Sequence, residues 1–143
     1  MKSLVLVLAG SCGLAMVNLV HAQGAQTVLD ENIKVVHYEQ MNYPPLARTA
    51  LAHGVVVISV RLDADGAVAD AEAISGNERL IRECISNAKK WRFNPTPQGK
   101  AVVVYRFESE SVICKDGKQR SVFKFEAPNL AIITACAQVI DHM

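Results

Sequence analysis

Residues 54–76 read GVVVISVRLDADGAVADAEAISG and carry the clearest secondary-structure pattern of the chain. From Val55 to Asp63 hydrophobic side chains alternate along the backbone, which is typical of a strand with one buried face. The dipeptide Asp65-Gly66 is the usual sequence of a two-residue hairpin turn, and Val68 to Ser75 supplies the returning strand. This stretch therefore predicts an antiparallel β-hairpin.

The segments on both sides of the hairpin predict helices. Upstream, Pro45 can open a short helix that ends at Gly54, a typical C-terminal cap. Downstream, Ser75-Gly76-Asn77 caps an amphipathic helix that Pro95 terminates. A strongly β-forming run, Ala101 to Phe107, then provides a third strand. The order helix, hairpin, helix, strand predicts an α+β fold in which an antiparallel sheet has the second helix packed across one face.

Residues 111–143 predict a C-terminal extension of the same domain. Asp116-Gly117 between two β-rich runs indicates a second hairpin, with Ser121 to Phe125 as its returning strand. Pairing of this returning strand with Ala101 to Phe107 would cover the free edge of the sheet. Leu130 to Ile140 is apolar almost throughout and predicts a buried helix, with homodimer formation as the alternative way to cover its surface.

The first 22 residues predict export from the cytoplasm. Lys2 gives a positive start, Leu4 to Val20 is apolar, and Val20-His21-Ala22 offers small or medium-sized residues for cleavage before Gln23. Two alternatives stay open: an uncleaved inner-membrane anchor, and a lipoprotein acylated at Cys12. Cleavage would give a periplasmic protein with residues 23–42 as a lead-in segment before the domain.

Charge and cysteine content narrow the class of protein further. Without the leader, 14 basic and 14 acidic residues remain, and no basic patch suggests nucleic acid as a partner. The exported chain keeps Cys84, Cys114 and Cys136. A disulfide between Cys114 and Cys136 with Cys84 as a buried free thiol is the simplest arrangement in an oxidising compartment.

No arrangement of side chains predicts chemistry. The histidines are isolated, no serine lies in a nucleophile elbow, and the aspartates near the hairpin turn lack the spacing of a calcium loop. We therefore expect no enzymatic activity, no cofactor and no bound metal ion.

A set of short motifs appears in a fixed order along the domain, residues 43–110. The motif residues are Tyr43, Pro44, Arg48, Gly54, Gly66, Gly76, Trp91, Phe93 and Pro95. Together these motifs resemble the C-terminal domain of the TonB family of energy transducers. Arg48 and Arg92, at a helix start and a helix end, are predicted to bridge to glutamates or carbonyl oxygens, with contact to a ligand as the alternative.

The resemblance implies an α+β fold, an antiparallel three-stranded sheet with helices packed on one face, and it implies a role as well. In full transducers this domain lies in the periplasm and grips a short extended segment of an outer-membrane receptor, which adds a strand to an exposed sheet edge. It implies here a periplasmic module that binds an extended peptide or an envelope protein partner, linked to TonB-dependent transmembrane transport. The matching edge is Val102, Val103, Val104, Tyr105, Arg106 and Phe107.

The sequence also departs from full transducers. Between the apolar leader and Tyr43 there is no proline-rich spacer, so we expect no transmission of force by this chain alone. The alternative function is a stand-alone structural or inhibitor-type periplasmic domain whose binding edge is filled by its own C-terminal strand.

Overall fold

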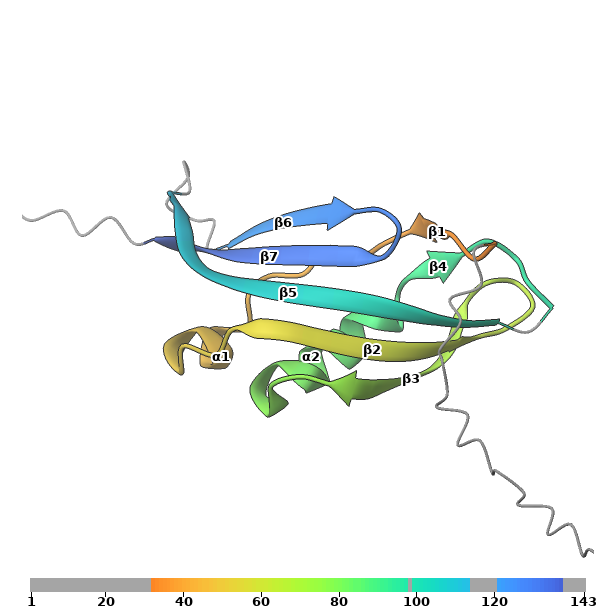
Figure 1. Ribbon diagram of the computed structural model, residues 1–143, viewed down its shortest axis with the longest axis horizontal. Helices are drawn as coiled ribbons and strands as arrows, with labels where there is room; N and C mark the ends of the chain where they lie inside the picture. Colours follow the sequence, from red (N-terminus) through yellow and green to blue (C-terminus); the bar gives the residue numbers. More distant parts are fainter. Residues whose placement is uncertain (1–31, 98, 114–120, 138–143) are drawn as a thin grey trace, which may run out of the picture.

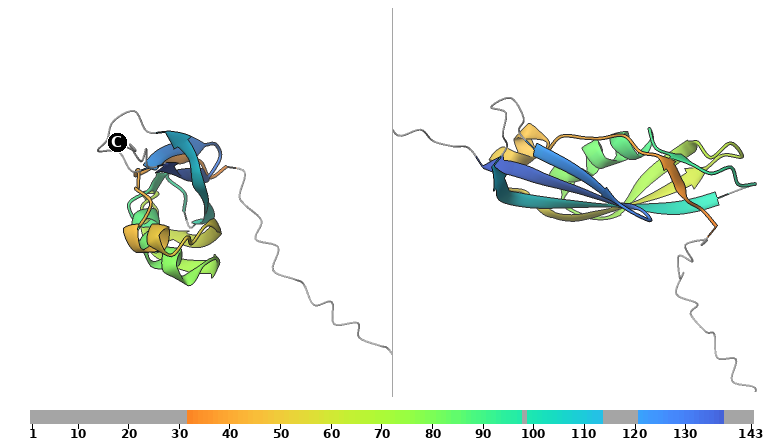
Figure 2. Two further views of the ribbon diagram at one scale, coloured as in Figure 1. Left: turned by 90° about the vertical axis from the view of Figure 1, so that its left-hand side faces the viewer. Right: turned by 90° about the horizontal axis from the view of Figure 1, so that it is seen from above.

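The computed structural model describes residues 32–97, 99–113 and 121–137, and the statements below concern these residues. The long strand β5 runs through the middle of a curved sheet, and Figures 1 and 2 show both helices on the inner side of that curve. In chain order the elements are β1 (Val35–His37), α1 (Pro45–Thr49), β2 (Gly54–Leu62), β3 (Val68–Ser75), α2 (Glu78–Ala88), β4 (Arg92–Phe93), β5 (Gly99–Ile113), β6 (Ser121–Glu126) and β7 (Leu130–Ala137).

The main sheet is five-stranded and mixed, with the order β3-β2-β5-β7-β6. Strand β2 pairs antiparallel with both β3 and β5, so the predicted hairpin and third strand are confirmed. The hairpin turn requires glycine, because Gly66 has a φ of 81° and a Cβ there would lie 2.0 Å from the carbonyl oxygen of Phe93. A separate two-stranded sheet joins β1 to β4.

The prediction of a three-stranded sheet was incomplete, because β7 and β6 extend it beyond β5. The predicted helix from Leu130 to Ile140 was wrong over Leu130–Ala137, which forms strand β7. A short, uniformly apolar run is compatible with either a buried helix or a strand buried on both faces. The neighbouring β-branched residues Ile132, Ile133 and Thr134 favour the strand.

The predicted partner of β5 was also wrong. Strand β6 does not pair with β5 but with β7, which lies between them and runs parallel to β5. Val103 and Tyr105 of β5 align with Ile58 and Val56 of β2, and all four side chains are buried.

The hydrophobic core lies between the inner face of the sheet and the two helices. Alternating residues of β2 and β5 meet Leu80 and Cys84 of α2, and all of them are buried. Burial, and then the charge of Glu83, raises the pKa of the Cys84 thiol to about 12, so this free cysteine stays protonated at neutral pH. The predicted buried free thiol is confirmed.

A buried asparagine joins three parts of the core. Asn87 Oδ1 accepts hydrogen bonds from Trp91 Nε1 and from Tyr105 Oη, both at 2.8 Å. Its Nδ2 donates to the carbonyl oxygen of Glu39 at 3.0 Å. Asn87 therefore fixes α2 to β5, to the aromatic residue that follows the helix, and to the lead-in segment.

The predicted leader, cleavage site and start of the lead-in segment fall outside the described residues. Neither helix within the described ranges has the length and hydrophobicity needed to cross a membrane.

The hydrogen bonds of Asn87 give a first testable prediction. We expect Asn87→Leu to lower the free energy of unfolding by about 2–4 kcal/mol, because three buried or half-buried polar groups lose their partner. We expect Tyr105→Phe to cost only about 1 kcal/mol, because the remaining groups stay paired. Urea denaturation measures both values.

The double variant provides the control. Because the Tyr105 hydroxyl has already lost its acceptor in Asn87→Leu, the double variant should cost less than the sum of the single ones. Strictly additive losses would show that Asn87 does not act through this hydrogen bond.

Candidate functional site

The predicted peptide-binding edge lies in the interior of the sheet. On one side of β5, residues 99–107 pair with β2. On the other side, Val104 to Glu108 pair with Leu130 to Thr134 of β7. A partner segment that added a strand to β5 would meet β7 in the same place.

The start of the predicted edge is also occupied, although β7 begins only opposite Val104. Asn129, just before β7, donates from Nδ2 to the carbonyl oxygen of Val102 at 2.7 Å. The amide of Val104 donates to the carbonyl oxygen of Asn129 at 3.0 Å. Backbone groups along residues 102–107 therefore have partners within the chain on both sides of β5.

Strand β7 belongs to the hydrophobic core. Ala131 and Ile133 are fully buried, and Ile132, Ala135 and Cys136 are less than a tenth exposed. Removing a buried isoleucine from its surroundings costs about 1.5–3 kcal/mol from its apolar surface alone. Displacement of β7 by a partner strand would thus expose part of the core.

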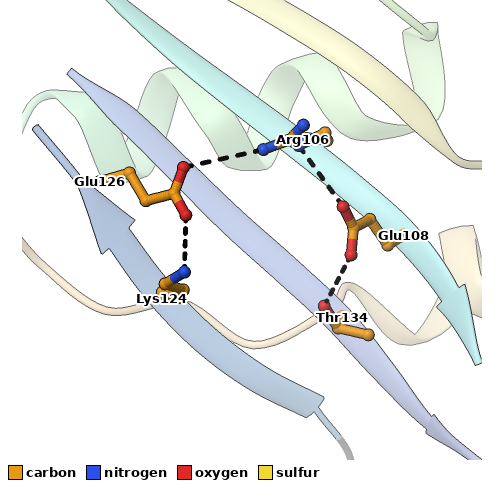
Figure 3. Close-up of polar contacts among 5 residues, drawn as sticks. All are labelled: Arg106, Glu108, Lys124, Glu126 and Thr134. Carbon is orange, nitrogen blue, oxygen red and sulfur yellow. Dashed lines mark hydrogen bonds and ion pairs between the residues drawn. The ribbon is translucent and has the colours of Figure 1, made fainter. Parts of the chain in front are cut away.

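A row of charged side chains crosses the outer face of β5, β7 and β6 (Figure 3). Arg106 Nε lies 3.4 Å from Glu108 Oε1 without forming a hydrogen bond, and its Nη2 lies 4.0 Å from Glu126 Oε2. Lys124 Nζ donates to Glu126 Oε1 at 2.6 Å, and Thr134 Oγ1 donates to Glu108 Oε2 at 3.2 Å. Strands β6 and β7 therefore share one polar network with β5 on this face.

The pKa of Glu126 is lowered within this row. The hydrogen bond from Lys124 is the largest cause, followed by the charge of Lys124, and the charge of Arg106 adds a smaller effect. Because the pKa is lowered in the folded protein, the contribution to stability is present above the ordinary glutamate pKa. It is lost as the pH falls through the lowered value.

Four of the nine family-motif residues are buried in the scaffold: Tyr43, Gly66, Trp91 and Phe93. Tyr43 donates its hydroxyl to the carbonyl oxygen of Ala52 and packs edge-on against Phe107, and burial raises its pKa. Trp91 is fully buried, and Phe93 is 3% exposed. These residues hold helices and strands together and present little surface to a ligand.

Arg48 performs a structural role too. Its guanidinium donates to the carbonyl oxygen of Cys136 at 2.6 Å, so the prediction of a bridge to a carbonyl oxygen is confirmed. This bond joins α1 to β7, two elements far apart in the sequence.

Strands β3 and β6 form the two edges of the five-stranded sheet. The lead-in segment and the first residue of the domain pack against β6: Tyr38 stacks on Phe123 and Phe125, and the Tyr43 amide donates to Ser121 Oγ at 3.0 Å. Strand β3 pairs only with β2, and Ile74 on it is 55% exposed. Within the described residues, β3 is therefore the more accessible edge.

Sequence reasoning missed the contribution of Asn129 to this site. Asn129 directly precedes the run that was predicted as a helix, yet it ends the turn between β6 and β7 and satisfies backbone groups of β5. A short turn followed by β-branched residues was the only available signal.

Only one of the two cysteines of the predicted disulfide lies within the described residues. Cys136 lies on β7, opposite Val112 of β5 in the parallel register, whereas Cys114 falls outside the described residues. The pairing of these two cysteines therefore stays a prediction.

The described residues contain no group of histidine, cysteine, aspartate and glutamate side chains that could hold a metal ion. A hollow of about 910 Å³ lies between residues 40–46 and α2. Its charged lining is mixed, with Arg79, Arg82 and Lys90 beside Glu78 and Glu83.

Comparisons with known proteins place these observations in a family context. Residues 39–108 match the family model described as Gram-negative bacterial TonB protein C-terminal. The solution NMR structure of the Pseudomonas aeruginosa TonB CTD is similar, with 22% sequence identity and a TM-score of 0.43. The match covers 65% of this chain and 95% of that one. A search of curated proteins finds no match.

The lowered pKa of Glu126 gives a second prediction. In Lys124→Ala the pKa of Glu126 should rise toward its ordinary value, because the largest cause of the shift is removed. Arg106→Gln should produce a smaller rise. Titration of the Glu126 carboxyl carbon by NMR measures both, and a larger effect from Arg106→Gln would contradict the assignment.

The cysteine pairing gives a third prediction. Alkylation of the exported, denatured chain without reductant should modify one cysteine, Cys84, and reduction should raise the number to three. The bridge would contribute about 3 kcal/mol to stability, because it closes a loop and so restricts the unfolded chain. As a control, Cys136→Ser should show two alkylated cysteines before reduction, and three in the unreduced native sequence would refute the bridge.

Proposed function

We propose that this chain, whose residues 39–108 form a TonB C-terminal-like domain, is a periplasmic protein-interaction module that binds an extended segment of an envelope protein along β3 rather than β5. TonB C-terminal domains are periplasmic in Gram-negative bacteria and mediate protein interactions in TonB-dependent transport. The predicted signal peptide is consistent with that compartment. The proposed role involves no catalysis.

The observation that carries this proposal is the pairing of β5 with β7. In the resemblance described above, a receptor segment adds its strand to the segment 102–107. Here that position holds β7, whose residues are mostly buried. A partner strand therefore needs another edge of the sheet.

Strand β3 offers that edge for two reasons. Its backbone is hydrogen-bonded to a neighbouring strand on one side only, so donors and acceptors remain on the other side. Ile74 and Glu72 are exposed on β3 and would supply an apolar and an acidic contact to an added strand. Main-chain pairing would give affinity, and these side chains would give selectivity.

The filled β5 edge also fits a second candidate function, a structural or inhibitor-type domain without strand binding. The two functions differ in what happens at β3. Binding at β3 identifies an interaction module, whereas an edge that stays open toward every envelope segment identifies a structural domain.

Amide hydrogen exchange in the presence of peptides tests the proposal. The probes are synthetic peptides that cover the extended periplasmic segments of outer-membrane receptors. We expect a binding peptide to protect amides of residues 68–75 from exchange and to leave the protection of β5 and β7 unchanged. New exchange in β7, as expected if a peptide displaced it, would contradict the proposal.

A pair of matched variants sharpens the test. Ile74→Lys should weaken peptide binding, because the exposed contact on β3 is lost without disturbing the core. Val36→Lys changes an equally exposed residue on β1 and should leave binding intact. Equal effects of the two substitutions, or no binding by any peptide, would rule out β3 as the interaction edge.

A further inference from the structure

A second hollow is lined by elements that lie at the end of the molecule far from α1, where Figure 1 shows β1, β4 and the turn from β6 to β7. It measures about 670 Å³ and opens between the small β1–β4 sheet, the start of β5 and the turn from β6 to β7. This volume is within the range of about 300–1,000 Å³ that is typical of small-molecule sites.

The walls of this hollow are mainly apolar. The charged residues among its lining are both basic, Lys34 on the segment before β1 and Lys100 on β5, and the lining includes no acidic side chain. The apolar walls are formed by Ile33, Val35, Phe93, Val102, Phe125 and Pro128.

Polar contacts fix the two sides of the hollow. On one side, Asn94 Oδ1 accepts a hydrogen bond from the backbone amide of Lys34. The backbone amide of Asn94 donates to the Lys34 carbonyl oxygen at 3.0 Å. On the other side, Asn129 holds the β6–β7 turn on β5 through Val102. The hollow is therefore bounded by anchored backbone, and a ligand would find it largely formed.

Neither lysine ammonium has an ion pair or hydrogen bond among the described residues. Lys100 also borders a smaller hollow with Arg61, Asp70 and Glu72, but neither the Asp70 nor the Glu72 carboxylate forms an ion pair with it. Two cations beside an apolar cavity favour a ligand that carries a negative charge at one end of a hydrocarbon chain.

We propose that this hollow binds a single-chain amphiphilic anion of the fatty-acid type. The acyl chain packs against the apolar walls, and the carboxylate contacts Lys34 and Lys100. This inference is independent of the function proposed for β3, because the hollow shares no lining residue with that strand.

Titration with dodecanoate below its micelle concentration tests the site on the full exported chain. The readout is the NMR shift of methyl groups of Ile33, Val35 and Val102 in the hollow, with Val55 and Ile74 on the outer face for reference. We expect saturable shifts confined to the hollow. Shifts of the reference methyl groups instead, or no shift at all, would overturn the proposal.

Two further measurements test the charge requirement. We expect Lys34→Gln/Lys100→Gln to weaken dodecanoate binding about tenfold or more, because two charged contacts are lost. Lys89→Gln/Lys90→Gln carries the same change in net charge at the exposed end of α2 and should bind as the unchanged protein does. Uncharged dodecanol should bind more weakly than dodecanoate, and equal affinities would overturn the role of the lysines.

Discussion

The backbone pairing between β5 and β7 is the interaction on which the rest of the structure depends. Because β7 lies between β5 and β6, it brings the aromatic side chains of β6 to the core, where Phe125 meets Trp91 at a ring-centroid distance of 5.8 Å. It also places the carbonyl oxygen of Cys136 within reach of Arg48. Without this strand, β5 would be an edge, and the aromatic core would lose one side.

Burial of polar groups imposes a second constraint on the same core. Trp91 and Tyr105 each bring a hydrogen-bond donor into an apolar environment, where an unpaired donor costs about 1–3 kcal/mol. Asn87 supplies one acceptor for both. Burial, and then the nearby Cys84, raises the pKa of Tyr105, so its hydroxyl keeps its proton and remains a donor. The orientation of α2 on the sheet thus follows from a polar contact as well as from hydrophobic packing.

Local patterns predicted the part of the fold that local rules determine. The alternation before Asp65-Gly66 identified the hairpin, the apolar stripe identified α2, and the β-forming run Ala101 to Phe107 identified part of β5. The position of β7 depends on contacts distant in sequence, and its apolar run had no period that distinguishes strand from helix. Residues 102–107 were therefore correctly predicted as a strand, but the strand that covers its second side is β7 and not the predicted segment Ser121 to Phe125. The hollow beside Lys34 and Lys100 was not predictable, because it forms where three distant segments meet.

The match to the TonB C-terminal family concerns residues 39–108, whereas β6 and β7 follow that range. Tyr43, Trp91 and Phe93 lie in the core, so the motif describes how the domain is built more than what it binds. A strand added after the motif can then change the available edge and leave every motif residue in place. For this reason, resemblance in the motif is compatible with a different binding surface, and the open backbone of β3 is the edge that we propose for a partner strand.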